Sequence, residues 1–133
     1  DQYDAVFCHY DFSGSNIIVE KASHNISVID FDNWKVSVRE EDFPKLLHWT
    51  VIDSKTQKRV SSPSLINDFV RGYERAGGLI NERVLRLKEA EWLLRVYSHS
   101  LYRENLDIES YRKSSFPCSE YYEQAILSLL KST

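Results

Sequence analysis

The hydrophobic pattern changes once along this chain, and that change limits the fold more than any other feature. Before residue 40 the β-branched residues stand in short runs, over 17–19 and 26–29, separated by the polar, turn-like residues 21–25. Such runs are typical of strands, and the polar stretch between them predicts a β-hairpin. After residue 40 apolar residues recur every three or four positions, which indicates amphipathic helices. We therefore expect an α+β fold, mostly α: a polar loop and a β-hairpin followed by a helical bundle.

Proline and glycine mark the bounds of the first two helices. One helix is expected over 40–51, where Pro44 is tolerable only because it stands near the start. The next is expected to begin at Ser62-Pro63 and to stop at Gly77-Gly78, because glycine adopts the left-handed backbone that ends helices. The polar residues 53–61 between them form the best linker candidate.

Two further helices complete the bundle. Asn81 is expected to cap the longest one, which runs to about Tyr102, and Ser119 is expected to cap the last. Apolar residues at helical spacing predict the buried stripe of the longest helix: Val84, Leu87, Ala90, Leu94, Tyr97 and Leu101.

Size and charge exclude several classes of protein. A length of 133 residues suits a single domain, residues 1–133. Lys plus Arg is 17 and Asp plus Glu is 20, so the net charge is −3, unlike the basic surface of a nucleic-acid-binding protein. No apolar run approaches the roughly 18 residues of a membrane span. Two cysteines are too few for a disulfide scaffold, and we expect reduced thiols in a cytoplasmic protein.

Oxygen-bearing side chains stand in the loop before the hairpin and at the hairpin's end. The loop reads His-Tyr-Asp-Phe-Ser-Gly-Ser-Asn from His9 to Asn16, and Asp30 follows the second strand. Because a hairpin returns its end close to its beginning, we expect Asp30 beside Asp11 and Asn16. Asp30 and Asn16 offer the hard oxygen ligands that Mg²⁺ takes. Asp11 is then free to accept a proton from an attacking hydroxyl, as phosphoryl transfer requires.

This segment resembles the catalytic loop and metal-binding aspartate of kinase-fold enzymes. It is more similar to the aminoglycoside phosphotransferase and choline kinase superfamily, in which H-G-D-x-x-x-x-N precedes three aliphatic residues and V-I-D-[FW] follows. The matching residues here are His9, Asp11, Asn16, Ile17-Ile18-Val19 and Val28-Ile29-Asp30-Phe31. Residues 8–12 and 29–32 are similar to those of CotS-type bacterial spore-coat kinases. The resemblance is strong over 6–34, moderate to about 80 and weak beyond.

The resemblance implies the C-terminal lobe of a small-molecule kinase that uses ATP and Mg²⁺. The catalytic loop and metal-binding hairpin then span 6–34, and the helical part spans 40–131. The resemblance makes Asp11 the catalytic base and Asn16 and Asp30 the metal ligands. It also implies supporting roles for three further residues: His9, Ser13 and Asp32. The implied acceptor is a hydroxyl of an aminoglycoside, amino alcohol or sugar-like compound, held by residues that the sequence does not identify.

The sequence departs from related patterns at several points. Ser13 stands where serine/threonine kinases carry a lysine, and no Ala-Pro-Glu follows Asp32, which favours a small-molecule acceptor over a protein. Tyr10 replaces the superfamily's usual glycine. Neither a glycine-rich phosphate loop nor the strand lysine of an N-terminal lobe is found in the sequence. We expect weak or no ATP turnover by the chain alone, and an exposed apolar surface that meets a missing N-terminal lobe or a second copy.

Other interpretations stay open at this point. Asp11, Asn16 and Asp30 could serve only in local capping and turn hydrogen bonds. A non-catalytic, kinase-derived scaffold or spore-coat-type protein is the alternative function. Asp32 could equally be a surface carboxylate. Asp42 either matches a family aspartate or is a helix N-terminal charge that stabilises the dipole, and the second account is the more economical.

Zinc and thiol chemistry are not favoured. Cys8, His9 and His24 have no further cysteine or histidine at ligand spacing. A nucleophilic pair of Cys8 and His9 would need facing side chains, whereas neighbours on an extended strand point apart.

Overall fold

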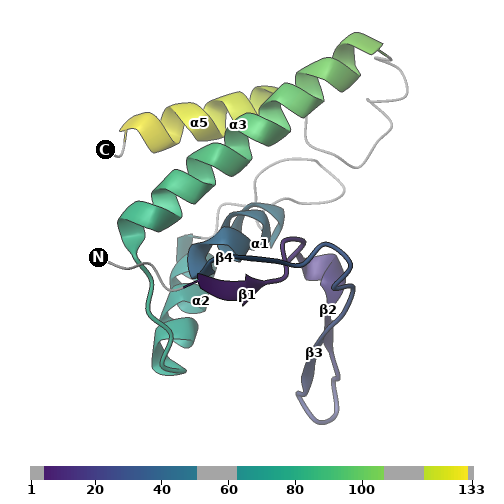
Figure 1. Cartoon of the computed structure of the whole chain (residues 1–133), viewed down its shortest axis with the longest axis vertical. Coiled ribbons are helices and arrows are strands. Elements are labelled where there is room, and N and C mark those ends of the chain that lie inside the picture. Colours follow the sequence, from purple (N-terminus) through teal and green to yellow (C-terminus); the bar gives the residue numbers. More distant parts are fainter. Residues whose placement is uncertain (1–4, 51–62, 107–118, 132–133) are drawn as a thin grey trace.

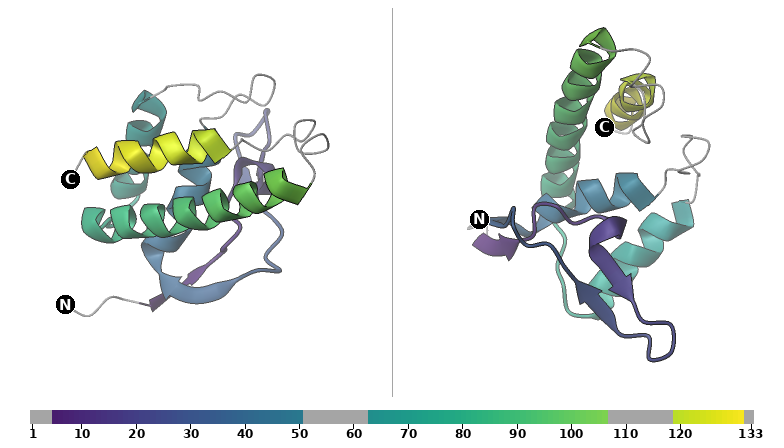
Figure 2. Two further views of the ribbon diagram at one scale, coloured as in Figure 1. Left: turned by 90° about the horizontal axis from the view of Figure 1, so that it is seen from above. Right: turned by 90° about the vertical axis from the view of Figure 1, so that its right-hand side faces the viewer.

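The structure is a computed structural model that describes residues 5–50, 63–106 and 119–131 (Figure 1). Two long helices, α3 (Glu82–Leu106) and α5 (Ser119–Lys131), lie side by side on one side of the molecule. The strands and the helices α1 (Phe43–Thr50) and α2 (Pro63–Arg75) lie on the other side (Figure 2). The expectation of an α+β fold that is mostly α is confirmed.

The predicted hairpin forms from β2 (Ile17–Val19) and β3 (Ile26–Val28), with Ile17 opposite Val28 and Val19 opposite Ile26. Its turn is closed by two hydrogen bonds, from the Glu20 amide to the Asn25 carbonyl and from the His24 amide to the Glu20 carbonyl. The hairpin projects away from the helices (Figure 2), so much of its apolar surface is exposed. The exposed apolar residues are Ile18, Val19, Ile26 and Ile29.

A second two-stranded sheet was not predicted. Strand β1 (Ala5–Cys8) pairs antiparallel with β4 (Lys35–Val38), from Ala5 opposite Val38 to Cys8 opposite Lys35. The chain therefore returns after the hairpin to the strand that precedes the loop 9–16. A short 3-10 helix, η2 (Arg39–Asp42), follows β4 and leads into α1. Pro44 stands at the second position of α1, as expected for a proline tolerated near a helix start.

Helix α2 ends at its two glycines as predicted. Gly77 has a φ of +88°, and the Gly78 amide donates to the Tyr73 carbonyl at 3.0 Å. A Cβ at Gly78 would lie 2.2 Å from the Tyr73 ring, so this position also needs glycine for space. Tyr73 packs edge-on against Phe43 with ring centroids 5.1 Å apart, which joins α2 to α1. The predicted linker 53–61 and the start at Ser62 lie outside the described residues.

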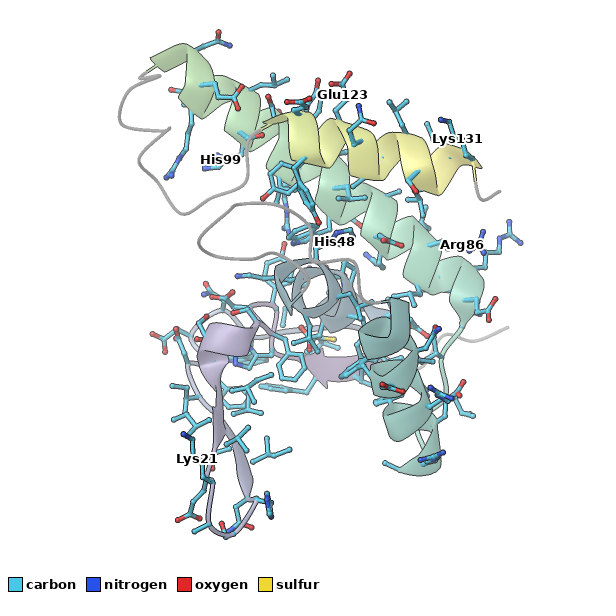
Figure 3. All side chains as sticks on the ribbon, turned by 180° about the vertical axis from the view of Figure 1, so that it is seen from behind. Lys21, His48, Arg86, His99, Glu123 and Lys131 are labelled. Carbon is cyan, nitrogen blue, oxygen red and sulfur yellow. The ribbon has the colours of Figure 1, made fainter. Side chains whose placement is uncertain are left out.

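Asn81 caps α3 as predicted. Its Oδ1 accepts the amide hydrogens of Arg83 at 3.1 Å and Val84 at 3.3 Å. Between α3 and α5 lies a cluster of buried side chains: Trp92, Leu93, Tyr122 and Ala125. His48 joins α1 to this cluster, because its ring stacks on Trp92 with centroids 5.2 Å apart (Figure 3).

The predicted buried stripe of α3 is wrong in part. Val84 is buried, but Leu87, Leu94 and Leu101 are 67%, 56% and 37% exposed. The side that packs against α1 and α5 instead carries Trp92 and Leu93. Large apolar residues occur on both sides of this helix, so their spacing could not identify the side that packs. Among the described residues, no helix is long and apolar enough to cross a membrane.

Candidate functional site

The loop after β1 is held by one carboxylate that lies more than thirty residues further along the chain. Asp42 Oδ2 accepts the His9 amide hydrogen at 2.7 Å, and Oδ1 accepts that of Tyr10 at 2.6 Å. The β1–β4 register puts the end of β4 opposite Ala5, at the far end of β1 from the loop, and η2, which follows β4, packs along β1 so that Asp42 reaches the loop. Asp42 thus fixes the loop backbone directly, a contact that the helix-dipole interpretation does not describe.

His9 links the loop to the end of the hairpin. Its Nε2 lies 2.8 Å from the Ile29 carbonyl oxygen, and its Nδ1 lies 3.2 Å from the Asp11 amide nitrogen, which donates to it. These partners require the proton on Nε2, since Nδ1 accepts. The imidazole is 4% exposed and packs against Phe31 with ring centroids 4.6 Å apart. His9 therefore holds residue 11 and residue 29 in a fixed relation.

Asn16 makes a second link between the same two segments. Its side-chain Nδ2 donates to the Asp11 carbonyl at 2.9 Å, and its own carbonyl accepts the Ile29 amide hydrogen at 3.0 Å. Because Nδ2 is occupied by this bond, Oδ1 is the atom left to bind a cation. Ser13 is buried beneath the turn, accepts the Asn16 amide hydrogen through its carbonyl, and pairs its Oγ with that of Ser15 at 2.8 Å.

The Asp11 carboxylate forms an ion pair with Lys45, on the first turn of α1. The two side chains retain 26% and 28% of their solvent exposure. Oδ1 of Asp11, the atom in the pair, has less than 1 Å² of accessible surface. Burial, and then the positive charge of Arg95, lower the pKa of the Lys45 ammonium. Lys45 was not among the residues predicted from the sequence.

Asp30 stands directly after the residue that His9 and Asn16 both contact. It is exposed and has a φ of +64°, a left-handed conformation that is costly for a residue with a Cβ. Asp32 is also exposed, in the turn that precedes β4. The backbone contacts thus bring residues 9, 11, 16 and 29 together. Within the described residues, no three His, Cys, Asp or Glu side chains gather in a way that could hold a metal ion by themselves.

Tyr10 has a backbone conformation that suits glycine better than a residue with a side chain. Its φ is +64°, which glycine adopts without strain. The tyrosine ring compensates through contacts with cations: the Lys35 ammonium lies 3.6 Å from its centroid and the Arg95 guanidinium 5.3 Å. Arg95 also donates a hydrogen bond to the tyrosine hydroxyl. Helix α3 therefore contributes a residue to the loop's surroundings.

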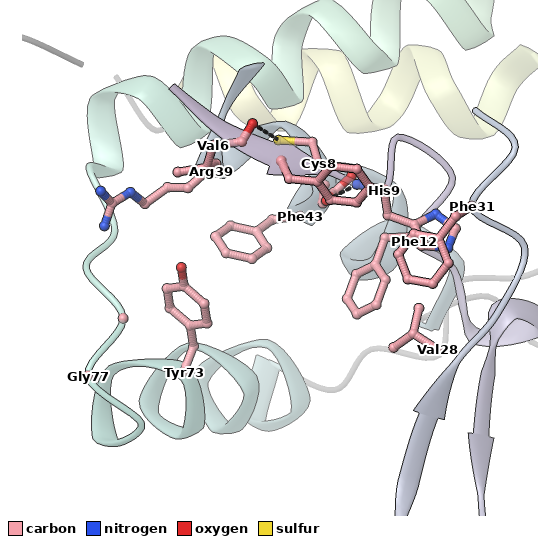
Figure 4. Close-up of a pocket in the computed structure, with 13 residues that line it drawn as sticks. Val6, Cys8, His9, Phe12, Val28, Phe31, Arg39, Phe43, Tyr73 and Gly77 are labelled. Atoms are coloured by element: carbon pink, nitrogen blue, oxygen red, sulfur yellow. Dashed lines mark hydrogen bonds between the residues drawn. The ribbon is translucent and has the colours of Figure 1, made fainter. Parts of the chain in front are cut away.

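A largely apolar cavity of about 520 Å³ lies behind the loop, between β1, the hairpin and α2 (Figure 4). Its wall includes the bracing residues His9 and Asp42, together with aromatic rings: Phe7, Phe12, Phe31, Phe43 and Tyr73. Cys8 also lines it, but burial, followed by the charges of Asp42 and Glu41, raises the pKa of its thiol to about 11. A thiol of that acidity is a poor nucleophile near neutral pH.

Lys45 was missed by sequence reasoning, and Asp42 was considered there as a family aspartate or a helix charge without a contact being assigned to it. Asp42 belongs to the acidic run 40–42, which is evident in the sequence. No neighbouring residue indicates that its carboxylate binds the backbone of the loop. Lys45 lies three residues further on and gives no sequence signal of its own. Both reach the loop because η2 packs along β1 and α1 contacts the turn of the loop, and neither contact has a local sequence signal.

A family model described as the phosphotransferase enzyme family matches residues 1–78, which is more than half of the 133-residue chain. The match includes the loop, the hairpin, η2 and α1. No curated protein and no solved structure matches the chain.

Proposed function

This chain belongs to the phosphotransferase enzyme family, and we propose that it carries the acid–base and metal-binding part of a kinase-type site. The reaction is transfer of the γ-phosphoryl group of ATP to a hydroxyl of a small molecule. The observation that supports this most is the double link, through His9 and Asn16, between the Asp11 loop and the residue before Asp30. That link orders one carboxylate for proton transfer and leaves a second one exposed nearby.

In the proposed step Asp11 orients the acceptor hydroxyl and accepts its proton. The acceptor oxygen forms a bond to the transferring phosphorus while the bond from phosphorus to the nucleoside diphosphate oxygen breaks. The proton then leaves Asp11 for solvent, so the carboxylate is restored. A positioned carboxylate base contributes about 10²- to 10⁴-fold to such a reaction, and most of the remaining acceleration comes from positioning and neutralisation of phosphate charge.

The available oxygens fit a magnesium ion. Asn16 offers Oδ1, since its nitrogen is used within the loop, and Asp30 offers an exposed carboxylate. Mg²⁺ is commonly bound by one or two protein oxygens plus water and phosphate oxygens, so a larger protein cage is not needed. When bound, the ion supplies positive charge to the phosphate oxygens. Asn16 and Asp30 hold it in this proposal, and His9 fixes their relation to Asp11.

The acceptor is proposed to be an aminoglycoside, an amino alcohol or a sugar-like compound, in a cytoplasmic enzyme of choline kinase-like or CotS-like type. We also propose that an ATP-covering lobe outside residues 1–133, or a second copy, completes the site. The exposed apolar residues of the hairpin support this, because they offer a surface for such a partner. The chain alone is then expected to turn over ATP slowly or not at all.

The test is phosphate transfer by the full-length protein, screened against hydroxylated amines and sugars. Asp11→Asn is expected to lower kcat by about 10³-fold and to leave nucleotide affinity within about threefold. Asp30→Asn is expected to abolish magnesium-dependent nucleotide binding. Asp68→Asn is the matched control, because Asp68 is an exposed aspartate of α2, and it should match the wild type.

Two results would reject the proposal. One is a wild-type protein that shows neither magnesium-dependent nucleotide binding nor transfer, as the scaffold alternative requires. The other is an Asp11→Asn variant that loses nucleotide binding but keeps normal turnover per bound complex.

A further inference from the structure

The two oxygens of the Asp11 carboxylate have different surroundings. Oδ1 is paired with the Lys45 ammonium and is shielded from solvent, whereas the side chain as a whole keeps 26% of its exposure. That exposure therefore belongs to the other atoms of the side chain. Oδ2 is the oxygen left to meet an acceptor hydroxyl.

Lys45 reaches Asp11 from a helix that contacts the loop. It lies on the first turn of α1, three residues after Asp42, and α1 packs against the turn η1 (Gly14–Asn16) of the loop. The same junction of η2 and α1 thus holds the loop backbone through Asp42 and the loop's central side chain through Lys45. Within the described part of the chain, no other cationic side chain pairs with Asp11.

The loop itself lacks a cation near its aspartate. Ser13, two residues after Asp11, is buried and bonded to Ser15. Without a partner, the Asp11 carboxylate could rotate about its side-chain bonds and would spend less time facing the acceptor. A misplacement of about 1 Å can lower a reaction rate by about 10²-fold. An ammonium held on a helix removes that freedom without occupying the second oxygen.

We infer that Lys45 is a positioning residue for Asp11, which holds Oδ1 so that Oδ2 faces the acceptor hydroxyl. This inference rests on the proposed function for its catalytic consequence. The ion pair itself can be tested without turnover. Lys45 does not exchange a proton in the step, since its role is to orient a group that does.

The first test observes the side-chain ammonium groups of the 133-residue chain by lysine-selective ¹H–¹⁵N NMR. A half-buried, paired ammonium exchanges its protons slowly, so Lys45 is expected to give a visible signal that disappears in Asp11→Asn. Lys88 is the matched control, because it is also partly buried and pairs with the Glu41 carboxylate at 2.9 Å, and its signal should persist. A Lys45 signal that is absent from the wild type, or unchanged in Asp11→Asn, would overturn the inference whether or not the protein is active.

The second test separates orientation from stability in the full-length enzyme. Lys45→Met is expected to lower kcat about 100-fold with the KM for ATP within about threefold. Lys45→Arg should recover most of the loss, and Lys88→Met should stay within about threefold of the wild type. If Lys45→Met lowers the melting temperature but keeps a wild-type kcat, the residue is only structural and the inference is wrong. If the wild type transfers no phosphate, the proposed function fails, and the NMR result alone decides the position of Lys45.

Discussion

Replacing Asp42 should loosen the loop 9–16 by an amount that follows from its contacts. The carboxylate accepts two backbone amide hydrogens, from His9 at 2.7 Å and from Tyr10 at 2.6 Å. A hydrogen bond to a charged group contributes about 1.5–3 kcal/mol. Asp42→Ala should therefore lower the free energy of unfolding by about 3 kcal/mol, the lower end of two such bonds, because the site is only half-buried. Asp42→Asn, which keeps one acceptor oxygen, should cost about half as much.

Urea unfolding followed by tryptophan fluorescence measures the change. With a denaturant dependence near 2 kcal/mol per molar, Asp42→Ala should lower the midpoint by about 1.5 M. Amide exchange at His9 and Tyr10 should accelerate more than exchange in α5, since the lost bonds are local. Asp68→Ala is the control, because its exposed pair with Arg71 contributes about 0.5 kcal/mol or less. A loss below about 1 kcal/mol for Asp42→Ala, or unchanged exchange at residues 9 and 10, would refute the reasoning.

Two further predictions follow from the loop and its supports. Tyr10→Gly should be more stable than Tyr10→Ala by about 1 kcal/mol, because both lose the ring contacts and only glycine tolerates the φ of +64° without strain; equal urea midpoints would contradict this. Although burial raises the pKa of Glu41, hydrogen bonds from Lys88, Lys35 and Ser37 leave it below its ordinary value of 4.5. The stability that Glu41 contributes is thus present above about pH 4.5 and is lost as the pH falls through the lower pKa of the folded state. Glu41→Gln should therefore make the free energy of unfolding depend less on pH on the acid side. Parallel curves of stability against pH for the variant and the wild type would contradict this.

Local signals predicted the local features of the fold. The β-branched runs located β2 and β3, Asn81 capped α3, and Gly77 ended α2 through its positive φ. Each of these depends on residues within a few positions of one another. The spacing of the loop residues also placed Asp11, Asn16 and the end of the hairpin close together, because a hairpin fixes the relation between its ends.

Distant pairings could not be predicted in the same way. The β1–β4 sheet joins residues about thirty positions apart, and β4 follows an exposed turn at residues 32–33. The contacts of Asp42 and Lys45 with the loop come from η2 and α1, which follow β4 in the chain and pack against β1 and the loop. The packing side of α3 was missed for a different reason, since the leucines at 87, 94 and 101 offered a second apolar side, which is 67%, 56% and 37% exposed in the structure.

The brace that Asp42 provides has a consequence for any shorter version of the chain. A peptide that stops at residue 34 keeps every oxygen donor of the motif but lacks both β4 and the carboxylate that receives the two amide hydrogens. Such a peptide would contain the residues of the motif but would lack the contacts that hold the loop backbone in place. The loop can therefore take up its folded conformation only after the chain has been synthesised through η2, which carries Asp42.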